Sequence, residues 1–170
     1  MHITFDHNCL IHLENGGKEA DAIRSILDDS NHQCYVVNVG ASEMQRFGVR
    51  PDNYASFENF LKLIGAAQLP RLDPLGIWNV TFFDRCLYAG EADQKLLTAI
   101  QDILFPVTLP EEEGDDRKAL NRLCDALTLW CHISYKNDVF LTTDKNFLKS
   151  TKLPKLLKLG VGRICLPWYT

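Results

Sequence analysis

"VFLTTDKNF", residues 139–147, is a run of strand-forming residues that stops abruptly at a carboxylate, Asp144. The start of the chain repeats this pattern, because "HITFDHNCL", residues 2–10, passes through Ile3 and Phe5 and then presents Asp6. One aspartate in such a place is typical of a helix N-cap. Two of them, each after an apolar strand, raise the question whether acids gather at one edge of a sheet. In open sheets of parallel strands the functional crevice lies beyond the carboxyl ends of the strands.

The composition favours a single globular domain. The chain has 170 residues, of which 46% are hydrophobic and 24% charged, and this is enough for one hydrophobic core. No apolar stretch approaches the roughly 20 residues of a membrane span, and the N-terminus lacks the pattern of a signal peptide. The six cysteines form no CxxC pair, which favours reduced thiols, and the five histidines follow no zinc-ligand spacing. We therefore expect a cytoplasmic protein without a membrane segment.

The charge is unevenly distributed along the chain. The net charge of −4 speaks against a generic nucleic-acid binder, yet residues 145–170 contain six basic residues and no acid. These are Lys145, Lys149, Lys152, Lys155, Lys158 and Arg163. A basic edge beside acidic residues can hold a polyanion whose reacting phosphate lies at the acids. The alternative, that the lysines are the solvated face of a helix, is equally compatible with the sequence.

Strands and helices alternate along the chain. The periodicity predicts strands over residues 2–5, 34–39, 138–143 and 161–167, with an edge strand at 76–83. It predicts helices over residues 18–27, 54–64, 91–104, about 116–135 and about 145–158. Two further helices are predicted by their starts alone, one from about residue 8 and one near Ser42, which is expected to be its N-cap. Residues 110–116, "PEEEGDD", are expected to be a solvated acidic loop. Strands separated by helices predict a three-layer α/β/α fold with a mainly parallel central sheet, in one domain.

Four acids are expected at the same end of this sheet. Asp6 and Asp144 follow the first and fourth strands, and Glu43 comes shortly after the second. Asp125 interrupts an apolar helix, where Asn121, Thr128 and His132 share its narrow polar stripe.

Each acid alone is explained by a helix cap, a first-turn dipole pair or a wet helix face. Together in one crevice they would repel one another, unless a doubly charged cation lay among them. Hard oxygen ligands favour Mg²⁺ or Mn²⁺.

These stretches resemble the PIN domain, a family of metal-dependent ribonucleases and related nucleases. The resemblance covers about residues 1–48 and 117–167 and runs through five segments: "FDHNCLIHL", "VVNVGASEM", "NRLCDALTL", "VFLTTDKNF" and "LGVGRICLP". The order of the acids and the 19-residue step from Asp125 to Asp144 are those of the family. The middle of the chain, about residues 66–116, is longer than in the small toxins of the family. We expect this insertion, with Trp78, Phe82, Leu87 and helix 91–104, to pack on the domain.

The resemblance implies a metal-dependent endoribonuclease that hydrolyses phosphodiester bonds in single-stranded RNA. Asp6, Glu43, Asp125 and Asp144 would hold one or two Mg²⁺ or Mn²⁺ ions, which activate water and stabilise the leaving oxygen. Asn8 and Thr142 would orient the aspartates, with Asn121 as a weaker candidate for the same task. Lys145 and Lys149 would bind flanking phosphates. A role as the toxin of a toxin–antitoxin pair, an antitoxin partner and a homodimer are further expectations of the resemblance.

Other functions are compatible with parts of the pattern. A phosphoaspartyl enzyme of the haloacid dehalogenase type needs a second aspartate two residues after the nucleophile, where this chain has Asn8. A receiver domain needs paired acids before its phosphorylated aspartate, and that pairing is missing. The main alternative is a catalytically inactive PIN-like module that binds RNA or a protein partner. The presence of all four acids favours catalysis over this alternative.

Overall fold

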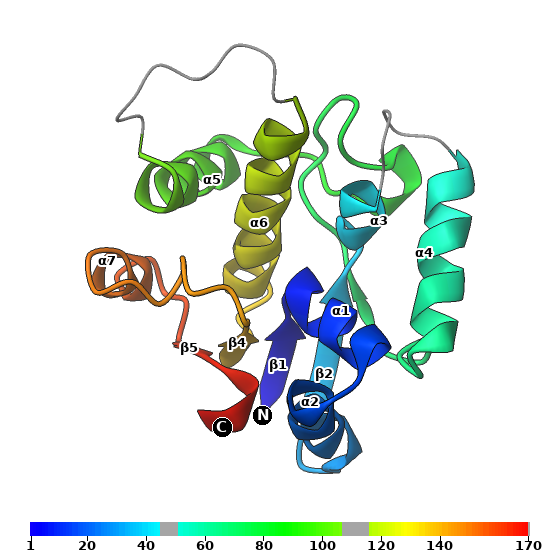
Figure 1. Cartoon of the computed structure of the whole chain (residues 1–170). Coiled ribbons are helices and arrows are strands. Elements are labelled where there is room, and N and C mark those ends of the chain that lie inside the picture. Colours follow the sequence, from blue (N-terminus) through cyan, green and yellow to red (C-terminus); the bar gives the residue numbers. More distant parts are fainter. Residues whose placement is uncertain (45–50, 107–115, 170) are drawn as a thin grey trace.

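The computed structural model describes residues 1–44, 51–106 and 116–169 and has a five-stranded, fully parallel sheet at its centre (Figure 1). The strands are β1 (His2–Phe5), β2 (Gln33–Val37), β3 (Arg71–Leu72), β4 (Val139–Leu141) and β5 (Arg163–Cys165). Their order in the sheet is β3-β2-β1-β4-β5, so the first strand of the chain is the central one. The predicted α/β class with a parallel sheet is confirmed.

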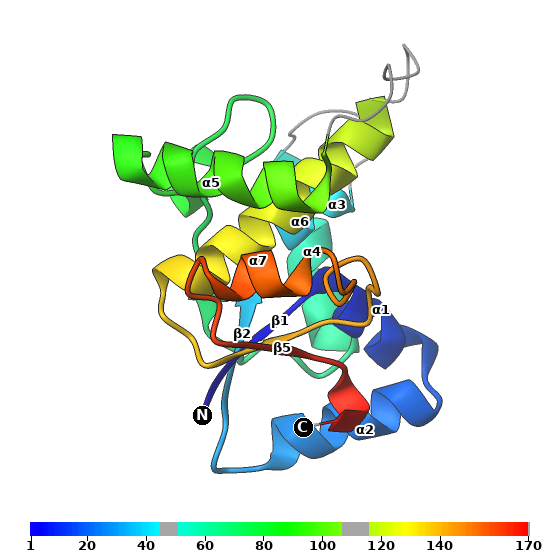
Figure 2. The same ribbon diagram turned by 90° about the vertical axis from the view of Figure 1, so that its left-hand side faces the viewer.

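Helices cover both faces of the sheet (Figures 1 and 2). The α-helices are α1 (His7–Asn15), α2 (Lys18–Asp28), α3 (Gly40–Glu43), α4 (Pro51–Leu63), α5 (Glu91–Leu104), α6 (Asp116–Ser134) and α7 (Leu153–Leu157). Two short 3-10 turns are η1 (Phe83–Arg85) and η2 (Pro167–Tyr169). Helices α1, α2 and α4 share one hydrophobic cluster with the sheet, and α5, α6 and α7 share the other. The result is a three-layer arrangement.

The two clusters follow from the two-residue period of the strands. In β4, Val139 and Leu141 pack with α1, α2 and α4, whereas Phe140 between them packs with α5, α6 and α7. In β2, Val36 and Val37 divide between the two faces in the same way. A strand that is apolar at every position is what a sheet buried on both faces requires.

The prediction of an edge strand at 76–83 is wrong. The edge strand β3 is instead Arg71–Leu72, and residues after it fold into turns that end in η1. The Ile77 N–H donates to the Thr81 hydroxyl at 2.7 Å, and Asn79 has a φ of 59°. This turn folds the chain back on itself, so the alternating Trp78, Val80 and Phe82 do not line one face of a strand.

Two helix predictions also need correction. Residues 145–152 form turns rather than the start of a helix, and only Leu153–Leu157 is helical. The Lys152 ammonium holds these turns by donating to the Leu104 carbonyl and to the Asn146 side chain. Ser42 is not an N-cap, because α3 begins at Gly40 and the Ser42 hydroxyl donates to the Val80 carbonyl.

The middle of the chain contributes directly to the core. Helix α5 has the predicted bounds, and its buried face, formed by Leu97, Ile100 and Leu104, packs in the cluster of α6. Of the other residues predicted to pack on the domain, Phe82 packs against the cluster of α1, α2 and α4, whereas Trp78 is 75% and Leu87 39% exposed. Most of the predicted acidic loop, residues 110–115, lies outside the described residues.

All six cysteines are free thiols. Among the described residues, no helix combines the length and the apolar character needed to cross a membrane.

Candidate functional site

The parallel sheet brings the predicted acids to one end of the molecule. Asp6 follows β1 directly and Asp144 follows β4, and these strands are neighbours with Phe5 opposite Leu141. Glu43 ends α3, which continues the chain after β2. Asp125 lies in α6, the helix that packs on the sheet in the cluster of Phe140.

Asp6 is the most deeply buried of the four acids. Its side chain is fully buried, and its Oδ2 accepts hydrogen bonds from the Thr142 hydroxyl at 2.6 Å and the Asn8 amide at 3.3 Å. Its Oδ1 is buried without a hydrogen-bond partner. Asp6 occupies the N-cap position of α1, yet its side chain makes no capping bond. The helix-cap explanation therefore fails for Asp6. A buried carboxylate oxygen without a partner requires a different explanation.

Burial raises the pKa of Asp6 to about 6, and the charge of Asp144 adds to this, while the hydrogen bonds from Thr142 and Asn8 act in the opposite direction. Burial likewise raises the pKa of Asp125 to about 8, with further contributions from the charges of Asp6 and Asp144. The charges of Asp6 and Asp144 thus act on Asp125 from the ends of the two strands. Asp125 is half-buried in α6, so it does not lie on a fully solvated helix face.

A single hydroxyl group joins the two strand-end aspartates. Thr142 donates its hydroxyl proton to Asp6, and its oxygen accepts the backbone N–H of Asp144 at 3.0 Å. The Asp144 carboxylate accepts the backbone N–H of Asn146 at 2.8 Å. Asp144 thus stabilises a local turn through one oxygen, as the capping explanation required, while its charge acts on Asp6 and Asp125.

Glu43 is held against α1 by the tight packing of α3. A Cβ on Gly40 would come within 2.9 Å of the Phe57 ring and 3.1 Å of His7 Nδ1, so only glycine fits this backbone position. The Glu43 carboxyl lies 3.6 Å from His7 Nδ1, and both side chains are largely buried. Burial lowers the pKa of His7 to about 4.

The pKa of Glu43 is raised well above its ordinary value by burial and by the charges of Asp6 and Asp125. The pKa of about 4 leaves the His7 imidazole neutral near neutral pH, so the Glu43–His7 contact is not an ion pair there.

The four acids interact through their charges, but their side chains do not form a closed ligand cage. In residues 1–44, 51–106 and 116–169 no group of three His, Cys, Asp or Glu side chains is arranged to hold a metal ion. Glu43 faces His7, and one Asp144 oxygen is engaged by Asn146. The donor chemistry and the orphaned Asp6 Oδ1 nevertheless fit a hard divalent cation, provided that side chains rotate toward it.

The remaining predicted residues are exposed. Lys145 and Lys149 are exposed and follow Asp144 in the chain. Asn121 is exposed one turn before Asp125 in α6.

Two polar residues at the same sheet edge were not predicted. Asn38 directly follows β2 and is buried; its amide donates to Asp73, which directly follows β3, at 2.5 Å. The Tyr54 hydroxyl of α4 donates to Asn38 Oδ1 at 2.9 Å. Asn38 was missed because the predicted strand extended to residue 39, whereas β2 ends at Val37. Asp73 was missed because β3 itself was missed.

Comparisons of the chain with protein-family models, with curated proteins and with solved structures give no match.

Proposed function

We propose that this protein is a divalent-metal-dependent endoribonuclease that hydrolyses phosphodiester bonds in single-stranded RNA. The observation that supports the proposal is the buried Asp6, whose Oδ1 has no partner, together with the three acids that interact with it through their charges. Carboxyl groups that raise one another's pKa in a buried site are costly for the fold, and such sites are typically functional. The resemblance of these segments to PIN domains supplies the reaction.

In this proposal Asp6, Glu43, Asp125 and Asp144 hold Mg²⁺ or Mn²⁺. Such an ion supplies a water of lowered pKa and stabilises negative charge on phosphate oxygens. Asn8 and Thr142 fix the orientation of the Asp6 carboxylate by the hydrogen bonds described above. Lys145 and Lys149 offer exposed cations to phosphates on either side of the scissile bond.

The direct test is the incubation of a fluorescently labelled, unstructured RNA with the purified protein and Mn²⁺ or Mg²⁺. We expect internal cleavage that EDTA abolishes and that restored Mn²⁺ recovers. A DNA of the same sequence tests whether cleavage requires the ribose of RNA. Intact RNA with either metal, over the whole range from acidic to alkaline pH, would contradict the proposal.

The second candidate function is a module of the same fold that binds RNA or a protein partner without cutting. The absence of a closed ligand cage in the described residues favours it. The two functions differ in one observable, because a non-catalytic module retains its RNA partner intact with Mn²⁺ present. They also differ in the effect of metal on stability, since a module without a metal site gains nothing from Mn²⁺.

The proposal extends to the biological setting implied by the resemblance, a toxin that a protein antitoxin inhibits. Induced expression in a bacterium should then stop growth, and the Asp6→Asn variant should not. Size-exclusion chromatography with light scattering measures whether the protein is a homodimer.

Replacement of Thr142 by valine tests the orientation of Asp6. Valine keeps the shape of the buried side chain but removes the hydroxyl that binds both Asp6 and the Asp144 backbone. We expect metal affinity or cleavage to fall about 10- to 100-fold. The pKa of Asp6 should rise above about 6, because the lost hydrogen bond favoured its charged form. Carboxyl titration by NMR and a cleavage assay measure these effects.

Thr142→Ser is the matched control, since it keeps the hydroxyl and should restore both values. Equal losses in the serine and valine variants would show that packing at this position matters and hydrogen bonding does not.

A further inference from the structure

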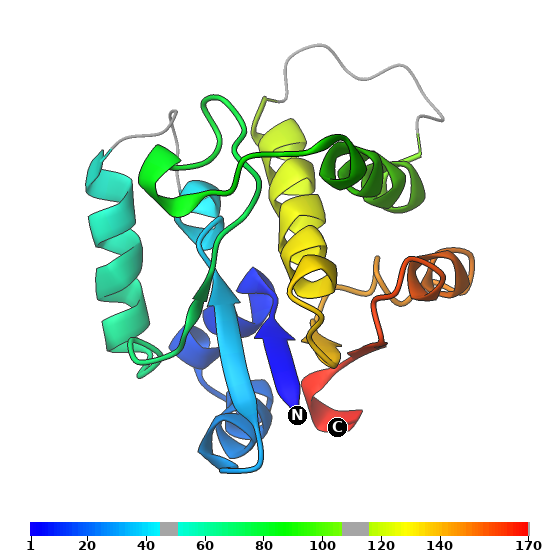
Figure 3. The same cartoon turned by 180° about the vertical axis from the view of Figure 1, so that it is seen from behind.

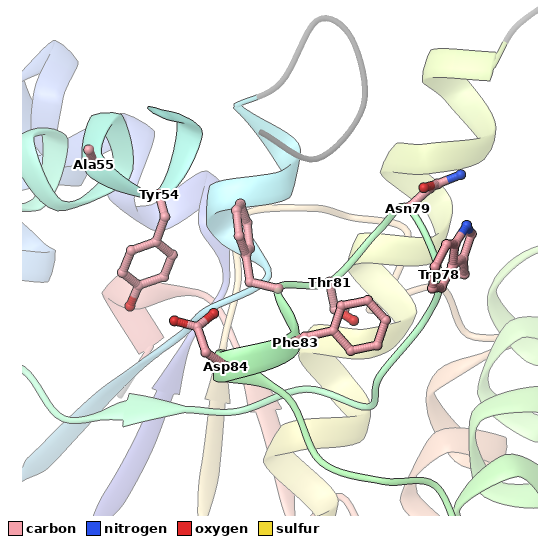
Figure 4. A pocket seen from close by; sticks show the side chains of 8 residues that line it. Tyr54, Ala55, Trp78, Asn79, Thr81, Phe83 and Asp84 are labelled. Atoms are coloured by element: carbon pink, nitrogen blue, oxygen red, sulfur yellow. The ribbon is translucent and has the colours of Figure 1, made fainter. Parts of the chain in front are cut away.

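An aromatic pocket lies between α4 and the segment that joins β3 to α5. This segment passes beyond the carboxyl ends of the strands before it reaches α5 (Figure 3). The pocket has a volume of about 620 Å³, within the range of about 300–1,000 Å³ that is typical of ligand sites. Helix α4 and the turn of the segment form its walls (Figure 4). The lining residues are Tyr54, Ala55, Trp78, Asn79, Thr81, Phe82, Phe83 and Asp84.

The pocket presents large aromatic surfaces to solvent. Trp78 is 75% and Phe83 71% exposed, and their rings contact each other edge to face with centroids 5.5 Å apart. Phe82 and Tyr54 form a second edge-to-face pair, also at 5.5 Å. Side chains of this size are rarely left uncovered in a group unless they bind something. Because each ring is held by another ring, the surface is shaped before a ligand arrives.

Hydrogen bonds join the pocket to the elements that carry the acids. The Ser42 hydroxyl, next to Glu43 in α3, donates to the Val80 carbonyl in the pocket turn. On the other wall, the Tyr54 hydroxyl donates to Asn38, at the end of β2. The pocket is therefore fixed to α3, the helix that carries Glu43, and to the end of β2.

The polar groups of the pocket match a nucleotide better than an apolar peptide side chain. The Asp84 carboxylate accepts, and the Asn79 amide both donates and accepts, hydrogen bonds of the kind that base edges offer. The guanidinium of Arg85 lies 4.7 Å from the centroid of the Tyr54 ring and supplies a cation for a phosphate at the pocket rim. Its Nε is 3.7 Å from the Asp84 carboxylate, so the two charges lie side by side.

We propose that this pocket binds an unpaired base of single-stranded RNA, stacked on Trp78 and Phe83, and so sets the position of the strand relative to the acids. Stacking of bases on aromatic side chains is the usual way in which proteins hold single strands, and it excludes duplexes because their bases are not accessible. The statement that the bound strand is the substrate rests on the proposed nuclease function. The binding of a base does not.

The test is RNA binding in EDTA, where no metal-dependent cleavage occurs. The probes are an unstructured fluorescent RNA of about 10 nucleotides and an abasic strand of equal length. We expect Trp78→Ala and Phe83→Ala each to weaken RNA binding about 10-fold or more, and wild-type protein to prefer RNA over the abasic strand by a similar factor. RNA should also quench the fluorescence of Trp78.

Two variants are matched controls. Trp168→Ala removes a tryptophan that is 45% exposed in η2, and Tyr88→Ala removes a ring that is 99% exposed but does not line the pocket. Both should bind RNA like the wild type. Thermal melts verify that all four variants are folded, which we expect because the removed side chains are exposed.

Equal affinity for RNA and the abasic strand would overturn the proposal, as would wild-type affinity in Trp78→Ala and Phe83→Ala. A change of self-association in these variants with unchanged RNA affinity would also overturn it, because the pocket would then be a protein contact. Binding that depends on the bases, without cleavage in Mn²⁺, would support the base-binding pocket and contradict the proposed nuclease function. If the pocket variants bind and cleave RNA like the wild type, the nuclease function is supported and the base-binding pocket is contradicted.

Discussion

The Asp6→Asn variant is expected to cut RNA at least roughly 1,000-fold more slowly than the wild type, which corresponds to about 4 kcal/mol of transition-state stabilisation. Asparagine can still accept the hydrogen bonds of Thr142 and Asn8 through its carbonyl oxygen. It cannot contribute negative charge to a bound cation. The substitution also removes a charge that raises the pKa of Asp125, so the metal-free variant should melt at or above the wild-type temperature.

Asp144→Asn and Asp125→Asn should lose cleavage in the same way, since both act on the same group of charges. Asp102→Asn is the control, because Asp102 is an exposed acid of α5, outside the site. A cleavage assay beside a thermal melt separates lost chemistry from lost folding. Full activity in any of the three site variants would exclude the metal-nuclease mechanism.

The second large effect is a loss of stability of the metal-free protein as pH rises. A carboxyl group with a raised pKa in the folded state holds a proton there that the unfolded chain has already released. Its contribution to stability is complete below the ordinary value near 3.8 and is lost as pH rises to the folded-state pKa. This value is about 6 for Asp6 and about 8 for Asp125. Glu43 acts in the same direction.

Two buried histidines act in the opposite direction at lower pH. Burial lowers the pKa of His7 and His132 from 6.5 to about 4, so protonation of the unfolded chain destabilises the fold as pH falls below 6.5. The carboxyl effect is therefore seen without this opposition between about pH 6.5 and 8. Over that range we expect the free energy of unfolding to fall by up to about 1.4 kcal/mol per pH unit, the slope for one proton.

Urea titrations at several pH values measure this slope, and Asp125→Asn should reduce it most. At the alkaline end, where the carboxylates are charged, Mn²⁺ at about 100 times its Kd should add about 2.7 kcal/mol, or about 5–10 °C in Tm. The Asp125→Asn variant should gain less. A wild-type Tm that saturating Mn²⁺ leaves unchanged would mean that the acids do not form a metal site.

The placement of Asp6 and Asp144 at one edge of the sheet could be inferred from sequence because it depends on few long-range contacts. Once the apolar strands before Asp6 and Asp144 are taken as parallel neighbours, both carboxylates must lie at one edge of the sheet. Helix α5 was also predictable, because its apolar positions repeat every three or four residues over its whole length.

What could not be inferred depends on contacts between distant segments. Strand β3 has only two residues, too few for a periodic signal, and it exists because Arg71 and Leu72 pair with β2. The alternating apolar residues at 76–83 have the pattern of a strand. The hydrogen bond to the Thr81 hydroxyl and the positive φ of Asn79 instead fold this segment into a turn that lines the pocket. The His7–Glu43 contact depends on the close approach of α3 to Phe57, which no local pattern encodes.

The central place of β1 in the sheet has a consequence for the order of events on the ribosome. Asp6 and Thr142 are hydrogen-bonded although 136 positions separate them, and β4 is the strand that brings them together. While a nascent chain still lacks β4, its Asp6 has no Thr142 to orient it and no Asp144 beside it. Contacts this distant in sequence also form slowly. A protein with this topology acquires its acid cluster only after Asp144 has been synthesised, so a growing polypeptide that ends before this residue would not contain the complete RNA-cutting site.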